Sequence, residues 1–198
     1  MTNLDVTELS CVNEILTAVG YGEVSSVSQT RDASQALKVL NSESATVQSE
    51  GWGFNLEYDY VLTAAGGGTL TMENDMLWAY PVDKSKRFAL RGQAFIDLKD
   101  NTTTSFSGDY KMVVCRFLNV ENCPRPARDY IVARAARVFQ DRFLGSPDIG
   151  NRLSRDEGMA RERLIGHEGD AQAYTAFDNI STAQIRAGRG FPIYSELQ

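Results

Sequence analysis

The sequence predicts an α+β protein, in which an antiparallel helical bundle from the N- and C-terminal parts carries an inserted antiparallel β-sheet or small barrel, followed by an extended C-terminal tail. Apolar residues recur at helical spacing in residues 1–51 and again in 124–178. Residues 52–123 instead alternate and are rich in β-forming residues. Residues 179–198 have no periodic apolar face. We therefore expect a helical domain in two parts, an inserted β domain and a tail.

The first helical part, residues 1–51, is predicted to hold two helices. Asp5, with Glu8 three residues later, has the pattern of an N-terminal cap, and Gly20 supplies a stop. These residues place the first helix at about 6–19. The second helix follows Asp32 and ends before Gly51. Its apolar face is small, which suits close packing against another helix.

The inserted part, residues 52–123, is predicted to form five or six antiparallel strands or a small barrel. Its connectors are rich in turn-forming residues, and the triple glycine Gly66 to Gly68 is interpreted as a hairpin loop. The expected strands lie at about 56–62, 70–72, 76–82, 88–98 and 110–120.

The second helical part, residues 124–178, opens with Pro124 and Pro126, which end the last strand and favour the start of a long helix. Gly145 ends that helix. Ser146-Pro147 then has the pattern of a new N-terminus, and the helix that follows is weakened by Gly158. Because the first and last helices flank the insert, we expect them to pack together and bring its two ends close.

The net charge of -6 is unevenly distributed along the chain. Residues 1–123 carry 9 basic and 16 acidic side chains, residues 124–165 carry 9 and 6, and residues 166–198 carry 2 and 4. All cations of the middle block are arginines, which form rigid bidentate pairs with carboxylate or phosphate. This block is either a contact surface or a solvated helix face with i,i+4 ion pairs.

Six residues are candidates for contacts with other subunits. Reversing Arg134 and Arg137 to glutamate is expected to weaken assembly while leaving the folding of the monomer intact, because we expect these arginines to meet the acidic β half of a neighbouring copy. The six candidates are Arg134, Arg137, Arg142, Phe139, Phe191 and Tyr194.

Catalytic motifs are scarce. The single histidine, His167, lies outside the zinc-helix pattern, and the three cysteines lack the paired spacing of a zinc site, so we predict no cofactor and no metal. The carboxylate pairs Glu57 with Asp59 and Glu73 with Asp75 leave one enzymatic alternative, a glycan hydrolase. We predict that the chain is not an enzyme.

A nucleic-acid-binding module is a third hypothesis, because aromatic residues are frequent in the β half and can stack on bases. The excess of acidic side chains in residues 1–123 argues against it, since an acidic surface repels phosphate. The aromatic residues are therefore interpreted as core or subunit contacts. They include Trp52, Phe54, Tyr58, Tyr60, Trp78 and Tyr80.

Two separated groups of packing residues resemble tail tubular protein A of short-tailed, T7-like bacteriophages. The later group departs from the family's pattern at Gln140-Asp141 and Leu144. The residues that carry the resemblance are the run Leu9-Ser10, Val12-Asn13 and Ile15-Leu16, then Gln48, Gly51-Trp52, Phe54-Asn55 and Glu57, and later Phe139, Arg142, Phe143 and Gly145.

The resemblance implies a structural virion protein that forms a dodecameric adaptor ring between the portal and the tail nozzle, which is tail tubular protein B. It also implies a surface for the tail fibre protein and a central channel through which genomic DNA passes without specific binding. No stretch reaches the roughly 18 apolar residues of a membrane span, and the N-terminus lacks a signal pattern. We expect no membrane contact, assembly in the host cytoplasm and a final location in the virion tail.

Overall fold

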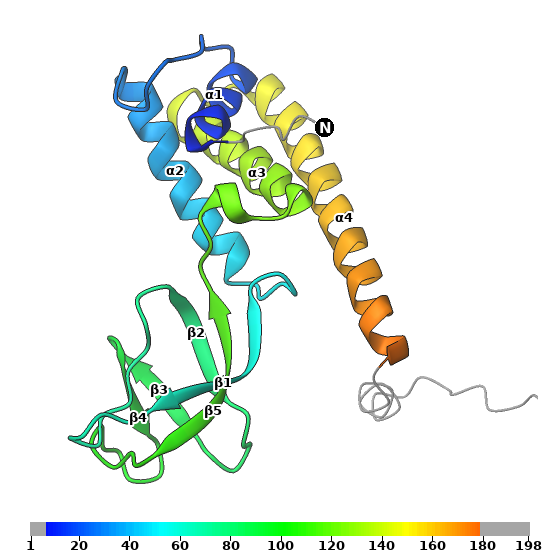
Figure 1. Ribbon diagram of the computed structural model, residues 1–198. Coiled ribbons are helices and arrows are strands. Elements are labelled where there is room, and N and C mark those ends of the chain that lie inside the picture. Colours follow the sequence, from blue (N-terminus) through cyan, green and yellow to red (C-terminus); the bar gives the residue numbers. More distant parts are fainter. Residues whose placement is uncertain (1–6, 179–198) are drawn as a thin grey trace, which may run out of the picture.

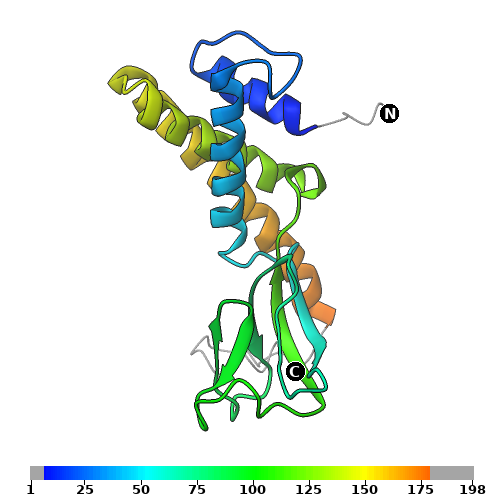
Figure 2. The ribbon, with the colours of Figure 1, turned by 90° about the vertical axis from the view of Figure 1, so that its left-hand side faces the viewer.

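The computed structural model describes residues 7–178, with side chains described through residue 169. The helices gather at one end of an elongated molecule and the strands at the other (Figure 1). Figure 2 shows the same division after a quarter turn, with the chain crossing twice between the two ends. The α+β class predicted from the sequence is confirmed, with a helical bundle and antiparallel sheets. The predicted tail, residues 179–198, lies outside the described residues.

Two N-terminal helices, α1 (Glu8–Ala18) and α2 (Arg31–Gln48), form as the apolar spacing predicts. The predicted cap Asp5 lies outside the described residues. The structure uses Thr7 as the cap of α1, in a reciprocal pair with Ser10, so the helix begins two residues later than predicted. Thr30 caps α2 by accepting a hydrogen bond from the backbone N–H of Ala33.

The β part holds five strands, but they form two sheets instead of the predicted single sheet. Three strands pair antiparallel in the order β1-β5-β2, and the other two form a separate hairpin. The predicted strand 88–98 is this hairpin, because the chain reverses at Gly92, whose φ is +64°. The strands are β1 (Leu56–Thr63), β2 (Met76–Pro81), β3 (Phe88–Arg91), β4 (Ala94–Asp97) and β5 (Asp109–Arg116).

Two more helices complete the bundle, α3 (Arg125–Phe143) and α4 (Pro147–Asp178). The predicted last strand stops at Arg116, and a short 3-10 helix, η1 (Val120–Asn122), leads into α3. Gly145, with φ +66°, separates α3 from α4. The helix α4 runs unbroken past Gly158, although a glycine costs about 1 kcal/mol in a helix interior.

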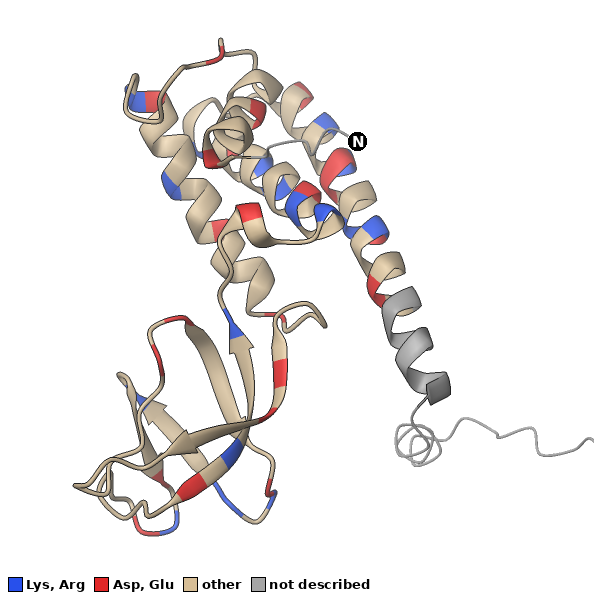
Figure 3. Cartoon of the chain, in the orientation of Figure 1, with Lys and Arg blue, Asp and Glu red and all other residues tan. Residues whose placement is uncertain are grey.

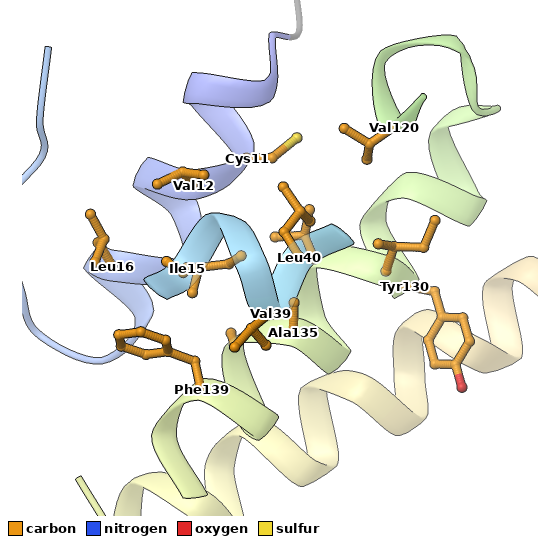
Figure 4. Packing of buried hydrophobic residues seen from close by; sticks show 14 of the residues in the cluster. Cys11, Val12, Ile15, Leu16, Val39, Leu40, Val120, Tyr130, Ala135 and Phe139 are labelled. Carbon is orange, nitrogen blue, oxygen red and sulfur yellow. The ribbon is translucent and has the colours of Figure 1, made fainter. Parts of the chain in front are cut away.

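Two hydrophobic clusters lie at the two ends of the molecule. The first unites side chains from all four helices, including Ile15, Leu40 and Phe139, and Figure 4 shows these three pointing toward one another. The second lies between the strands and includes Leu70, Phe95 and Met112. The N-terminal and C-terminal helices thus share one core. The boundaries of the four proposed domains stay a prediction.

A buried polar network joins the two clusters. The side chain of Asn55 donates to the carbonyl oxygens of Gln48 and Arg116, both at 2.9 Å. Gln48 exchanges two hydrogen bonds with the backbone of Leu118, and the indole of Trp78 donates to the carbonyl of Ser49 at 2.9 Å. These bonds connect the end of α2 with the start of β1, with β2 and with the chain that leaves β5. They therefore make the junction stiff.

The lower half of α4 passes this junction (Figures 1 and 2). There the carboxylate of Glu168 accepts a hydrogen bond from the backbone N–H of Gly53 at 2.7 Å. A side chain at position 53 would place its Cβ 2.8 Å from that carboxylate, so glycine permits the contact. Among the described residues, no helix is long and apolar enough to cross a membrane.

Candidate assembly surfaces

The arginines predicted to contact a neighbour are already paired within the chain. The Nε of Arg134 donates to Glu43 at 2.8 Å, and the Nη1 of Arg134 lies 3.4 Å from Glu157. Glu43 is 5% exposed, so this is an ion pair inside the helical bundle. The hydrogen bond that Arg134 donates to Glu43 raises the pKa of Arg134, which keeps the guanidinium charged.

Arg137 makes a similar set of contacts one turn away. It binds the other carboxylate oxygen of Glu157, and its second nitrogen lies 3.0 Å from Asp141. A glutamate at position 134 or 137 would therefore face buried carboxylates. These ion pairs argue against the expectation that reversal of Arg134 and Arg137 leaves folding intact, because the arginines neutralise charges that α2 and α4 bring into the bundle.

The remaining interface candidates fall into three groups. Phe139 is fully buried, with its ring 4.8 Å from that of Phe143, so it belongs to the core and not to the surface of the monomer. The side chain of Arg142 is 55% exposed and lies 3.9 Å from Glu43, which leaves most of it accessible. Phe191 and Tyr194 lie outside the described residues.

A cluster around Arg116 was not predicted from the sequence. Its Nε donates to Glu57 at 2.9 Å, and its Nη1 lies 2.9 Å from both Glu73 and Asp75. The guanidinium also lies 4.7 Å from the ring centroid of Tyr60. Partial burial opposes the charge of Arg116, but the hydrogen bonds that it donates to the carboxylates outweigh this effect and raise its pKa. Three half-exposed carboxylates around one cation leave a negatively charged surface, named here the Arg116 cluster.

This geometry weakens the glycan-hydrolase alternative. A glycosidase needs one carboxyl group with a raised pKa as its acid. The pKa of Glu73 is instead lowered, first by the hydrogen bond from the Tyr60 hydroxyl and then by Arg116. Asp59 departs from the pair with Glu57, because a β-bulge gives it φ +56° and brings it 3.8 Å from Lys111.

The other candidate groups have structural surroundings. His167 is exposed and lies within the helix α4. The three cysteines are buried thiols, and burial raises the pKa of Cys11 and of Cys123 to about 11. Within residues 7–169, no group of three or more histidine, cysteine or acidic residues is arranged to hold a metal ion.

The aromatic residues of the β part divide by exposure. Trp52 and Phe54 pack against the helical core, and Tyr60 packs against the core between the strands. Tyr58 and Tyr80 are 70% and 60% exposed on the edge strands β1 and β2. The interpretation as core residues holds for the first three, and the two tyrosines remain available for contacts.

The fold and its charged clusters define an α+β protein in which arginine–carboxylate groups hold the framework and the exposed faces of α4 and of the strands are open to other molecules. The family model for the tail tubular protein matches residues 9–174, so the chain belongs to the tail tubular protein family. A search of curated proteins gives no match. The family consists of structural proteins of bacteriophage tails, and this chain is therefore a structural component of a phage tail.

Proposed function

We propose that this protein forms the adaptor ring between the portal and the tail nozzle of a short-tailed bacteriophage. The observation that carries the proposal is the family match across residues 9–174, which spans both the helical bundle and the strands. In this proposal twelve copies form the ring, and assembly takes place in the host cytoplasm before the particle is complete.

The shape of the molecule supports two separate docking ends. The helical bundle and the strands lie at opposite ends of the chain (Figure 1), and the polar network at Gln48 and Asn55 holds them in a fixed relation. We assign the helical end to the portal and the strand end to the nozzle protein, tail tubular protein B. The outer rim of the ring then offers a surface for the tail fibre protein.

The charge of the chain supports passage of DNA through the ring. The net charge is -6, and an acidic lumen lets a polyanion pass without being bound. The channel therefore retains and releases the genome without base-specific contacts.

The proposal is tested by the mass of portal rings, taken from the same phage genome, before and after mixing with this protein. Native mass spectrometry is expected to show a gain of about twelve protomers of 21.9 kDa each. Bovine serum albumin at the same concentration is the control for non-specific adhesion. Intact portals that gain no mass beside a monodisperse monomer would overturn the adaptor assignment.

A further inference from the structure

The exposed face of α4 carries arginines that form no ion pair within the described part of the chain. Arg155, Met159 and Arg163 follow one another at intervals of four residues and are all exposed, so they lie along one side of the helix. Within residues 7–169, neither Arg155 nor Arg163 forms an ion pair. This differs from Arg134 and Arg137, whose charges are neutralised inside the bundle. We name these three residues the α4 stripe.

The Arg116 cluster has the opposite character. Glu57, Glu73 and Asp75 are each about half exposed and exceed the single positive charge of Arg116. In Figure 3 the strand β1 carries acidic bands, whereas the described part of α4 carries both basic and acidic bands, and among its basic residues Arg155 and Arg163 are exposed and form no ion pair within residues 7–169. The two surfaces differ in position and are opposite in charge, which is what a head-to-tail contact between identical copies requires.

The charges of the two surfaces are spaced within the reach of long side chains. Eight residues of helix separate Arg155 from Arg163, which corresponds to about 12 Å along the axis. Glu57 lies on β1 and Asp75 directly precedes β2, and both strands neighbour β5. The carboxylates of Glu57 and Asp75 converge on the one guanidinium of Arg116, each 2.9 Å from one of its nitrogens. The two arginines of the stripe therefore reach the cluster by inclining their long side chains toward its centre.

The middle of the α4 stripe is less polar than its ends. Met159, 43% exposed, lies midway between the two arginines of the stripe. In the cluster, the ring of Tyr60 lies against the guanidinium of Arg116, with 4.7 Å from the guanidinium carbon to the ring centroid. Thioether groups make favourable contacts with aromatic rings and with the apolar stems of long side chains. Met159 therefore completes a contact in which apolar atoms are flanked by ion pairs.

We propose that the α4 stripe of one protomer binds the Arg116 cluster of the next and that this contact closes the ring. The inference rests on the proposed function, since it names the surfaces by which the copies of the adaptor meet. It replaces the expectation that Arg134 and Arg137 supply the positive partner.

Two charge-reversed proteins test the contact. The first carries Arg155→Glu and Arg163→Glu, which make the α4 stripe negative. The second carries Glu57→Lys and Asp75→Lys, which make the cluster positive while Glu73 still holds Arg116. In a head-to-tail ring, each variant repels itself. A one-to-one mixture pairs every negative stripe with a positive cluster and every positive stripe with a negative cluster, so an alternating ring can close.

The readout is the mass gained by portal rings, with the wild-type protein in parallel. Each variant alone is expected to need at least about tenfold more protein for half occupancy, as like charges across a contact cost more than 1.4 kcal/mol. The equimolar mixture is expected to regain the wild-type occupancy. A control with Arg91→Glu and Arg125→Glu, which changes the net charge as the first variant does, is expected to assemble like the wild type.

Folding of each variant is checked by its melting temperature. If the cluster variant melts early, the neutral pair Glu57→Gln and Asp75→Asn replaces it and is expected to weaken assembly to a smaller extent. Variants that assemble as the wild type does, or a mixture that assembles no better than its components, would overturn the contact while leaving the adaptor ring in place. A wild-type protein that never adds to the portal would instead overturn the ring itself.

Discussion

Gln48 and Leu118 exchange two hydrogen bonds across the junction between the helices and the strands. The amide nitrogen of Gln48 donates to the carbonyl oxygen of Leu118 at 2.8 Å, and the backbone N–H of Leu118 donates to the amide oxygen of Gln48 at 2.7 Å. Gln48 is fully buried, and its side-chain amide bonds both backbone groups of Leu118 in the way that a neighbouring strand would. This pairing explains how the chain leaves the last strand without breaking the helical core.

Replacing Gln48 by methionine, which has a similar volume, should destabilise the protein by about 1–3 kcal/mol, because two partly buried backbone groups of Leu118 lose their partners. Chemical unfolding monitored by circular dichroism measures the effect. The matched control is Gln93→Met, since the side chain of Gln93 is exposed and in the described structure bonds only to the exposed Asn74. Equal stability of the two variants would contradict the role given to Gln48.

Reversal of Arg134 should unfold or strongly destabilise the monomer. The Arg134→Glu variant leaves Glu43 buried beside a second carboxylate, and breaking a buried pair costs about 3–5 kcal/mol. The control Arg125→Glu alters an exposed i,i+4 pair and should cost less than about 1 kcal/mol. Thermal unfolding of the isolated monomers separates the two. A stable Arg134→Glu monomer would show that the ion pair contributes little.

The Arg116 cluster should make stability depend on acidity. The pKa of Glu73 is lowered from 4.5 in the folded state by Tyr60 and Arg116, so its contribution is fully present above pH 4.5. The contribution is lost as the pH falls through the lower pKa of the folded state. Glu73→Gln removes this dependence. Unfolding curves of both proteins between pH 7 and pH 3 should therefore converge at low pH, and parallel curves would argue against the shift.

The cysteine thiols should be protected until the protein unfolds. Cys11 and Cys123 are buried, and burial raises the pKa of each to about 11, so almost no thiolate exists at pH 8. Ellman's reagent should react slowly with the folded protein and at once in denaturant. A single substitution, Cys11→Ala, should reduce the final signal by one thiol without speeding up the rest. Fast labelling of the folded protein would show that the helical core opens readily.

The parts of the structure that follow local rules were predictable from the sequence. The apolar spacing around Ile15 and Leu40 predicted α1 and α2, and Pro126 with Gly145 marked the two ends of α3. The split into two sheets was missed, because the turn at Gly92 lies inside a run of residues that all favour strands. The split into two sheets is visible only in the pairing of β4 with residues 70–72. These residues lie far from β4 in the sequence, so local patterns do not predict the pairing.

The candidate site was harder to predict, because charge in a sequence does not reveal its partner. The nine arginines of residues 124–165 look alike in the sequence, yet Arg134 faces Glu43 from α2 while Arg155 faces solvent. The Arg116 cluster joins residues from three separate segments and has no local motif. Only the acidic residues of the cluster attract attention in the sequence, because Glu57, Glu73 and Asp75 belong to the carboxylate pairs considered there for a glycan hydrolase.

The adaptor assignment is tested most directly by a cryo-electron microscopy reconstruction of the portal mixed with this protein. A closed ring of about twelve protomers, with the helical bundle against the portal, the strands directed away and α4 of each copy beside β1 and β2 of the next, is the expected result. A ring attached by its strands, or portals with no added density, would contradict it.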